Sequence, residues 1–492
     1  MSLTSGKKKP KKKKPCQAGL LPCKVKKGKK KRTLCVDAST DRTNCGGCGV
    51  TCASGQSCVQ GTCQNATTST TTSTTTPAPC AEGTTRCYGT CIPSSATCCV
   101  PDGATLRAEL KAGGPETITL CPNTTYVGQF STNRDVTLVG AGADSTVLDG
   151  NAASSVVAVG AGANVALRKL RITNGRGNLG GGIYSVGTKV TLEEVKVSEN
   201  RSSYDGAGIW AFGNLLLINS DVTDNACGGD FTVGYGGGIH AQGGEVILRR
   251  SRVLRNSAIS GGGIRTRAAV GPVGGHVTLE DGSEVSSNSA SFGGGVQLYE
   301  GGSLTLKAGT SVKNNSANLG AGIDNINGTV VLHEDAVVSD NEGVSFGGGI
   351  NNEGILTLKS GSRVEFNSAT YGGGIYTKHT LTLETGSCVS NNAASDQGGG
   401  IANSGTAVLE ADSQVSENTG ANGGGFFHSG GTATFKTGSR VTNNRASQGG
   451  GVSSPYGPVT LDIDTIVTGN FLLDGTTPSN CAPVNTIPNC VG

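Results

Sequence analysis

Glycine, asparagine and alternating apolar positions recur along residues 180–470 with a nearly constant period. A Gly-(Gly/Ala)-Gly-(Ile/Val/Phe) tetrad occurs eleven times, mostly 25 to 27 residues apart, with two longer spacings of 30 and 32. A Val-x-x-Asn motif precedes most tetrads, and an alternating trio such as Val277-Thr278-Leu279 lies between the two. The tetrads end at Ile183, Ile209, Ile239, Ile264, Val296, Ile323, Ile350, Ile375, Ile401, Phe426 and Val452. The motif asparagines are Asn200, Asn225, Asn256, Asn288, Asn315, Asn341, Asn367, Asn392, Asn418, Asn444 and Asn470.

A period of this length is typical of a solenoid, in which each repeat buries its apolar face only by stacking on its neighbours. Each repeat holds three short segments with period-two alternation, separated by Gly, Asn and Ser turns. We therefore predict an all-β fold, a right-handed parallel β-helix of about thirteen coils with three strands per coil. The repeated glycines are expected at corners that need positive φ or close backbone contact.

The asparagine column has two interpretations. A ladder of side-chain amides would satisfy backbone groups at the turns. A repeated metal or ligand site would need about two carboxylates per coil, and these are missing from the repeat. We therefore predict a structural ladder, and we expect neither a metal nor a cofactor.

Composition divides the rest of the chain into segments. Leu106-Arg107-Ala108-Glu109-Leu110 has the pattern of a short amphipathic helix, which would cover the open end of the solenoid. The predicted segments are a disordered basic segment at 1–34, tied down at Cys16 and Cys23, a Cys-rich module at 35–65, a Thr-rich linker at 66–79, a second small Cys-rich segment at 80–100, the β-helix at 101–475 with its cap helix at about 103–113, and a C-terminal tail at 476–492.

Of the 18 cysteines, 16 lie outside the repeats. This clustering predicts disulfides formed in an oxidising compartment, so we expect an extracellular or cell-surface protein whose leader is removed or whose start lies upstream. Zinc binding is the alternative for the first cluster, but residues 35–63 contain no His. The predicted disulfide cysteines are Cys45, Cys48, Cys52, Cys58 and Cys63, then Cys80, Cys87, Cys91, Cys98, Cys99 and Cys121, and finally Cys481 with Cys490. Cys227 and Cys388 are expected to be free, because six coils separate them by about 29 Å.

The charge is unevenly distributed. Residues 7–32 hold 14 Lys and Arg and no acidic residue, so the remainder carries −10 within a total of +4. Such an arm either contacts an anionic polymer or is a solvated tail. No aromatic residue interleaves the lysines, so specific nucleic-acid recognition is not expected. No apolar run approaches about 18 residues, so no transmembrane helix is predicted.

Two parts of the chain resemble known families. The Asn-Cys-Gly-x-Cys-Gly core at residues 44–49 resembles small Cys-rich modules of secreted bacterial proteins and of the plant stigma-specific family. Segments such as Thr146-Val147-Leu148-Asp149-Gly150 resemble the opening coils of the pectin-lyase-like β-helix superfamily. The tetrads and Val-x-x-Asn motifs resemble the repeats of chlamydial polymorphic outer-membrane proteins, over roughly residues 101–470, but have Gly at the third tetrad position and Val in place of Phe. The superfamily resemblance implies a lyase or hydrolase, yet its Asn-Thr-Asp and paired-Asp motifs are absent.

A candidate surface follows from the strand period. If the apolar residue of each tetrad points inward, the next residue points outward. Aromatic, basic and acidic side chains would then line one exposed strip, where sugars could stack and hydrogen-bond. The predicted ligand-binding residues are Tyr184, Trp210, Phe212, His240, Arg265, Arg267, Tyr299 and Tyr376. The alternative is a varied solvent face whose aromatic residues only protect strand edges.

An enzymatic version of this strip uses His240 or Arg265 as base, with Asp324 and Glu353 nearby. Asp462 and Asp464 are a weaker pair of carboxylates, placed on one strand face. The sequence therefore favours a non-catalytic, monomeric, adhesin-like protein that binds a polysaccharide or cell-wall polymer. The alternative is a polysaccharide lyase or glycoside hydrolase that acts on the outer face of the β-helix.

Overall fold

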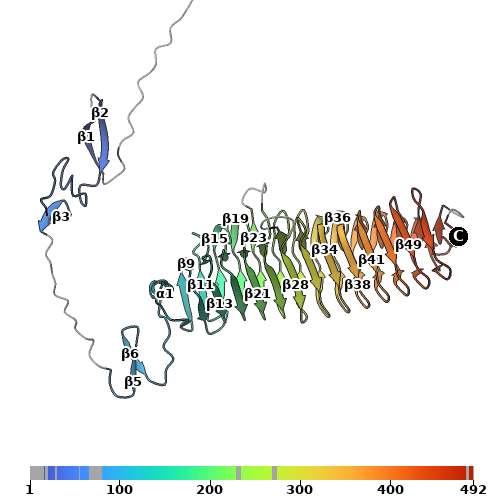
Figure 1. Ribbon diagram of the computed structural model, residues 1–492, viewed down its shortest axis with the longest axis horizontal. Coiled ribbons are helices and arrows are strands. Elements are labelled where there is room, and N and C mark those ends of the chain that lie inside the picture. Colours follow the sequence, from blue (N-terminus) through green and yellow to red (C-terminus); the bar gives the residue numbers. More distant parts are fainter. Residues whose placement is uncertain are drawn as a thin grey trace, which may run out of the picture. The chain divides into compact units, whose positions relative to one another are not determined.

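The computed structural model describes residues 16, 20–27, 30–54, 56–65, 80–228, 234–268, 274–483 and 487–490. The chain divides into two compact units, Met1–Glu82 and Gly83–Gly492. Figure 1 shows the second unit as a stack of coils that follow one another in sequence order. The predicted fold class, a right-handed parallel β-helix preceded by disulfide-rich segments, is confirmed.

The first unit is small and disulfide-bonded. Strands β1 (Leu21–Lys27) and β2 (Lys30–Val36) pair antiparallel, and β3 (Gln56–Val59) pairs with β4 (Thr62–Asn65). The β1–β2 hairpin lies largely within residues 1–34, where the sequence predicts disorder except at Cys16 and Cys23. This part is ordered because two disulfides fasten the hairpin. The four disulfides of this unit are Cys16–Cys35, Cys23–Cys48, Cys45–Cys58 and Cys52–Cys63.

A second disulfide-rich segment leads into the β-helix. It contains the hairpin of β5 (Thr84–Cys87) and β6 (Thr90–Pro93). Cys87 is bonded to Cys98 and Cys99 to Cys121, while Cys80 and Cys91 are also disulfide-bonded. The predicted Thr-rich linker at 66–79 lies outside the described residues, as does most of the basic arm.

A typical coil of the second unit holds four strands, whereas the coils over residues 117–159 and 239–295 hold three. In one coil these are β16 (Ile183–Ser185), β17 (Lys189–Glu193), β18 (Lys196–Ser198) and β19 (Arg201–Asp205). Each pairs in parallel with its counterpart in the next coil. The prediction of three strands per coil is therefore wrong for the coils with a β19-type strand, because such a segment has no apolar alternation and is defined by backbone pairing.

The strands assemble into long sheets along the solenoid. The β16-type and β17-type strands share a 26-stranded sheet, and the β18-type strands form a 14-stranded sheet that runs from β8 (Thr124–Val127) to β54 (Ile466–Thr468). The β16-type strands after β16 are β20 (Ile209–Ala211), β24 (Ile239–Gln242), β27 (Ile264–Arg267), β30 (Val296–Leu298), β34 (Ile323–Leu332), β37 (Ile350–Leu358), β40 (Ile375–Thr377), β44 (Ile401–Asn403), β48 (Phe426–His428) and β52 (Val452–Ser453).

The tetrads fix the register of this stack. Their apolar residues, from Ile183 to Val452, pair in one column and are fully buried. The first glycine of the tetrad at Gly180 has φ of +59°, a conformation that favours glycine. A Cβ on Gly182 would lie 2.6 Å from the carbonyl oxygen of Gly208, one coil away. Both predicted roles of the glycines are therefore present.

The asparagine column forms a buried ladder, as predicted. At a typical rung, Asn288 Nδ2 donates to Asn315 Oδ1 one coil later and to the Val253 carbonyl one coil earlier, both at 3.0 Å. The Asn288 backbone N–H donates to the same Asn315 oxygen at 2.9 Å. The ladder runs from Asn200 through Asn470, and Asn480 of the C-terminal tail supplies the last Oδ1 acceptor at 3.2 Å.

Both ends of the solenoid are covered. Helix α1 (Gly103–Glu109) is capped by the Asp102 carboxylate and buries Leu106 in the same core as the coils. The cap helix is confirmed, although it ends before the predicted residue 113. At the other end β56 (Cys481–Ala482) pairs with β52, and Cys481 is bonded to Cys490.

In the part of the chain that the structure describes, no helix is long and apolar enough to span a membrane. Cys227 and Cys388 are the free cysteines, and burial raises the pKa of the Cys227 thiol to about 12, which disfavours the nucleophilic thiolate.

Candidate functional site

We call the residues that follow the apolar residue of each tetrad the outer column. Strand pairing aligns them in consecutive coils on the outer face of the 26-stranded sheet. Its members are Tyr184, Trp210, His240, Arg265, Gln297, Asp324, Asn351, Tyr376, Ala402, Phe427 and Ser453.

The middle of the outer column is buried, so the prediction of an exposed strip is wrong there. Trp210 and Arg265 are each 6% exposed, and His240 and Asp324 are each 1% exposed. We call the residues just before each tetrad the flanking column, and its aromatic members pack against side chains of the outer face. Tyr235 of this flanking column, for example, lies against the Arg265 guanidinium at 4.1 Å.

Polar members of the outer column hydrogen-bond to one another along the stack. Arg265 Nε donates to Gln297 Oε1 at 3.0 Å, and Gln297 Nε2 donates to Asp324 Oδ2 at 3.0 Å. Asn351 Nδ2 donates to Asp324 Oδ1 at 2.7 Å. Burial raises the pKa of Asp324 to about 6, although both amide donors favour its charged form. We call these four residues the polar row.

The basic members of the column are held in place by their neighbours. The Arg265 guanidinium lies between Tyr235 and Tyr299, and burial lowers its pKa while nearby Asp205 opposes that shift. Burial and the two arginines at 265 and 267 lower the pKa of His240 to about 3, so its ring is neutral. The His240 Nδ1 and Trp210 Nε1 atoms are buried and have no hydrogen-bond partner.

The remaining catalytic candidate, Glu353, is engaged elsewhere. It pairs with Lys378 Nζ at 2.6 Å, and this ammonium also lies over the rings of Phe346 and Tyr376. Phe346 stacks on Tyr371 with ring centres 5.0 Å apart.

His240 and Asp324 lie three coils apart, about 14 Å along the stack. The four catalytic candidates, His240, Arg265, Asp324 and Glu353, therefore do not converge on one point.

Two other predicted features have different surroundings. Phe212 is 44% exposed, and exposed Arg267 lies 3.7 Å from Glu300. Asp462 and Asp464 lie in the turn after β53 (Val459–Leu461) rather than on a strand face, which corrects the prediction. Asp462 lies 3.7 Å from Lys436, so this pair is a charged turn on the surface.

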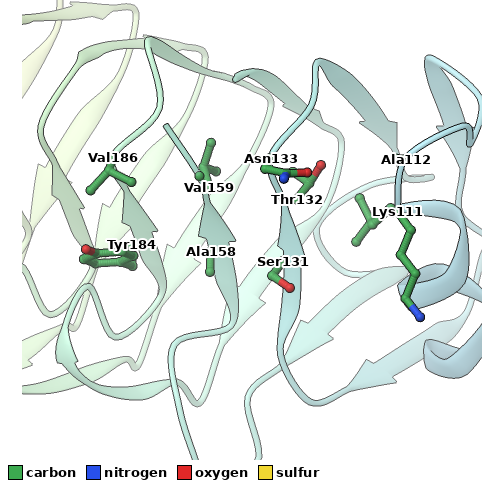
Figure 2. A pocket seen from close by; sticks show the side chains of 11 residues that line it. Lys111, Ala112, Ser131, Thr132, Asn133, Ala158, Val159, Tyr184 and Val186 are labelled. Carbon is green, nitrogen blue, oxygen red and sulfur yellow. The ribbon is translucent and has the colours of Figure 1, made fainter. Parts of the chain in front are cut away.

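A cavity of about 570 Å³ lies at the N-terminal end of the outer column. Figure 2 shows Tyr184 on β16 and Val186 just after it, beside β12 (Val157–Val159) and β9 (Phe130–Thr132), with Lys111 and Ala112 following α1. The residues that pair in line with Tyr184 are Ala158 and then Ser131. These small side chains leave a hollow beside the tyrosine ring.

Tyr184 forms one wall of this cavity. Its ring stacks on Trp210 with centres 5.1 Å apart and planes 11° apart, so Trp210 lies behind it in the next coil. The Ser131 hydroxyl and the Asn133 amide also line the cavity, and Lys111 supplies a positive charge. The Thr132 hydroxyl is instead hydrogen-bonded to the Arg134 backbone. No carboxylate or imidazole is among the lining residues.

The sequence predicted Tyr184 but not the rest of this cavity. Ser131 and Ala158 belong to coils that precede the first tetrad, so the repeat did not mark their positions. The flanking column was also missed, although Tyr235, Phe346 and Tyr371 each stand directly before a tetrad glycine. That spacing is a signal from which these aromatic residues could have been found.

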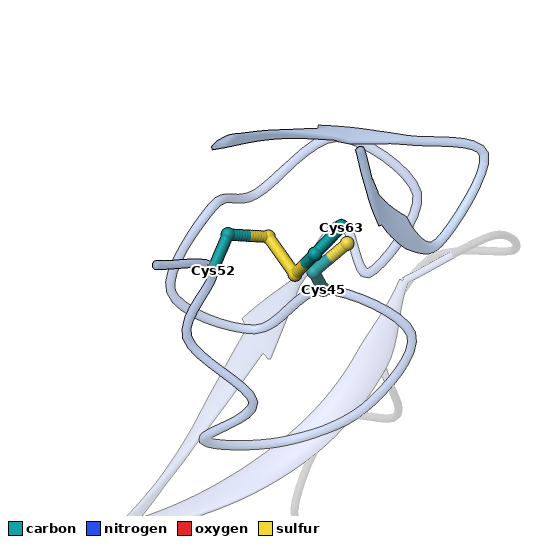
Figure 3. A group of neighbouring side chains, drawn as sticks. All are labelled: Cys45, Cys52 and Cys63. Atoms are coloured by element: carbon teal, nitrogen blue, oxygen red, sulfur yellow. A yellow bond between two sulfur atoms is a disulfide. The ribbon is translucent and has the colours of Figure 1, made fainter. Parts of the chain in front are cut away.

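The cysteine cluster of the first unit is a pair of neighbouring disulfides. The sulfur atoms of Cys45, Cys52 and Cys63 lie within 4.8 Å of one another, a spacing that a metal could use. Figure 3 shows the bond between Cys52 and Cys63, and Cys45 is bonded to Cys58. Because all four thiols are oxidised, they offer no thiolate ligand.

Comparisons with known proteins add the following. No protein-family model matches the chain, and no curated protein matches its sequence. Among solved structures, the A-module of the mannuronan C-5 epimerase AlgE6 from Azotobacter vinelandii is similar at 14% identity and a TM-score of 0.28. That likeness covers 75% of this chain and 93% of the epimerase module.

Proposed function

We propose that this chain is an extracellular, non-catalytic protein that binds a polysaccharide through the outer face of its β-helix. The observation that carries this proposal is the cavity beside Tyr184. An aromatic ring held by a second ring offers a rigid apolar face for a sugar, and hydroxyl and amide groups beside it match sugar hydroxyls. Sixteen disulfide-bonded cysteines support an oxidising, extracellular location.

The absence of carboxylate and imidazole groups from the cavity lining supports binding rather than hydrolysis. General acid–base catalysis requires a titratable group within hydrogen-bond reach of the substrate, directly or through one water molecule. The residues that line this cavity supply only the Lys111 ammonium and the Tyr184 phenol, besides hydroxyl and amide groups. The lysine favours a polymer that carries carboxylate groups.

A polysaccharide lyase or hydrolase is the second candidate, and one observation favours it. The raised pKa of Asp324 is typical of a general acid or base that works near neutral pH. Against this role, Asp324 is 1% exposed, and each carboxylate oxygen accepts a hydrogen bond from an amide. Both oxygens are thus engaged within the polar row.

The test uses the full chain and an immobilised panel of polygalacturonate, xyloglucan, galactomannan and laminarin. Bound fraction, new reducing ends and absorbance of unsaturated products are recorded on the same samples. We expect binding without cleavage, and Tyr184→Ala should weaken affinity about tenfold through loss of ring stacking. Ala158→Phe, which fills the hollow and leaves Tyr184 in place, should have a similar effect.

Tyr204→Ala is the matched control, because Tyr204 is 52% exposed on β19, outside the cavity. Binding that is unchanged in both Tyr184→Ala and Ala158→Phe would contradict the proposed site. Cleavage by the wild type that disappears in Asp324→Asn would instead identify an enzyme. A chain that binds no member of the panel would refute the proposal.

A further inference from the structure

A second cavity, of about 300 Å³, lies at the C-terminal end of the same outer column. Its lining includes Phe427 of the column, Tyr456 of the following loop and Pro483 of the tail. As at the other end, the column changes here from an aromatic ring to small side chains. Phe427 pairs in line with Ser453, and Ser453 pairs with Ala482.

Three side-chain amides form one wall of this cavity. Gln397, Asn422 and Gln448 are paired in register on β43 (Ala393–Gln397), β47 (Thr419–Asn422) and β51 (Arg445–Gln448). They therefore repeat about every 4.8 Å, and amide side chains supply both donors and acceptors. The Asn422 Nδ2 also donates to Asp396 Oδ1 at 3.2 Å. Neighbouring hydroxyl groups of a sugar need this combination of donors and acceptors.

Two aromatic residues complete the site. Phe427 is 4% exposed within the column, whereas Tyr456 is 77% exposed on a loop whose Ser454 hydroxyl donates to the Gly457 carbonyl. The tail that carries Pro483 is held by the Cys481–Cys490 disulfide and by pairing of β56 with β52. The described lining residues carry no charge, so recognition there rests on hydrogen bonds to sugar hydroxyl groups and on the aromatic rings.

We propose that this cavity is a second saccharide subsite, which binds sugar hydroxyl groups, so that one polymer chain is held at both ends of the outer column. The inference rests on the proposed function. Nine coil-to-coil pairings separate Tyr184 from Phe427. The span is about 43 Å along the stack.

Two sites on one rigid body raise the affinity for a polymer that can reach both. Once one site is occupied, the second encounter is intramolecular and has a high effective concentration. An oligosaccharide too short to span about 43 Å binds each site independently and gains nothing from the pair. Long and short ligands therefore distinguish one site from two.

The experiment uses the polysaccharide of the panel that the wild type binds. Binding of the full chain is measured to this polymer and to its hexasaccharide. We expect two hexasaccharides per wild-type chain, and one per chain for either Tyr456→Ala or Ser453→Phe. We expect one for Tyr184→Ala as well, and none for the double variant Tyr184→Ala/Tyr456→Ala. Each single variant should also lose at least tenfold in affinity for the polymer, whereas Tyr204→Ala should lose none.

The outcomes separate this inference from the proposed function. One hexasaccharide per wild-type chain, with no effect of Tyr456→Ala or Ser453→Phe, would overturn the second subsite and leave the first intact. Sensitivity to Tyr456→Ala without any sensitivity to Tyr184→Ala would overturn both the pair of sites and the proposed function. A wild type that binds no polymer of the panel refutes the proposed function, and the inference fails with it.

Discussion

Asn315 illustrates how one buried side chain serves three coils. Its Nδ2 donates to Asn341 Oδ1 at 3.0 Å and to the Val285 carbonyl at 3.1 Å. Its Oδ1 accepts from both the backbone N–H and the Nδ2 of Asn288, at 2.9 and 3.0 Å. A single amide thus satisfies polar groups that have no access to water.

Replacing this residue should destabilise the β-helix strongly. Asn315→Ala removes the acceptor of the Asn288 backbone N–H and the donor to the Val285 carbonyl, and each orphaned buried group costs about 1–3 kcal/mol. We therefore expect a loss of at least about 2 kcal/mol, seen as a lower denaturant midpoint. Asn318→Ala, at an exposed position of the same coil, is the control. Equal midpoints for the two variants would contradict the role of the ladder.

Asp324 should make the stability of the β-helix depend on pH. Its pKa of about 6 in the folded chain lies above the ordinary 3.8, so its contribution to stability is fully present below pH 3.8. That contribution is lost as the pH rises through about 6, by at most about 3 kcal/mol. Asp324→Asn should therefore abolish most of the fall in denaturant midpoint between pH 4 and pH 7.

Asp144→Asn, at an exposed position, should leave this pH dependence unchanged. The contrary result is a wild-type denaturant midpoint that rises between pH 4 and pH 7 relative to that of Asp324→Asn. It would show that folding does not raise the pKa of the Asp324 carboxyl.

For single residues, the sequence predicted which face of a strand a side chain occupies, but not whether that side chain is exposed to water. Period-two alternation correctly places Ile264 inside and Arg265 on the other face of β27. Whether Arg265 meets water depends on Tyr235 and Tyr299, which are some 30 residues away along the chain and adjacent only through stacking. The same applies to the cavity, because the small residues Ala158 and Ser131 create space only beside Tyr184.

At the scale of elements, α1 protects the first coils of the solenoid. Leu106 is fully buried against the core, so Leu106→Ala should cost about 2–5 kcal/mol locally. Because coils contact mainly their neighbours, we expect amide exchange to accelerate across residues 117–150 and to remain unchanged across 350–470. Val127→Ala, at a half-exposed position on β8, is the control, and uniform acceleration along the whole stack would contradict local capping.

The repeat motifs predicted three of the four strand families. The tetrads, the trios and the Val-x-x-Asn motifs mark strands whose side chains alternate between core and surface. The fourth family, exemplified by β19 with its sequence Arg-Ser-Ser-Tyr-Asp, carries no such alternation. These segments are strands because the stack of coils sets their pairing, which periodicity within one segment cannot reveal.

At the scale of the whole molecule, the two units depend on different forces. The core cluster of the first unit consists of Cys45, Cys52 and Cys58, with Cys63 packed against it. The second unit has a continuous apolar core that runs from Val100 to Cys490. A unit with so little apolar burial needs its disulfides in order to stay folded.

Reduction should therefore unfold one unit and spare the other. With reductant and trypsin, we expect faster cleavage after Arg42, the one Lys or Arg within residues 35–65, and no new cleavage within residues 146–468, as mapped by mass spectrometry. Digestion of the oxidised chain under the same conditions is the control. Identical peptide maps with and without reductant would show that the first unit folds without its disulfides.

The asparagine ladder also has a direction. In every rung the NH₂ group points toward the next coil and the side-chain oxygen points toward the previous one, from Asn200 to Asn470. Amide dipoles arranged head to tail add together, and bonds in such a chain polarise one another. The ladder therefore carries an electrical polarity along the solenoid axis, with its negative end at Asn200 and its positive end at Asn470, produced by uncharged side chains.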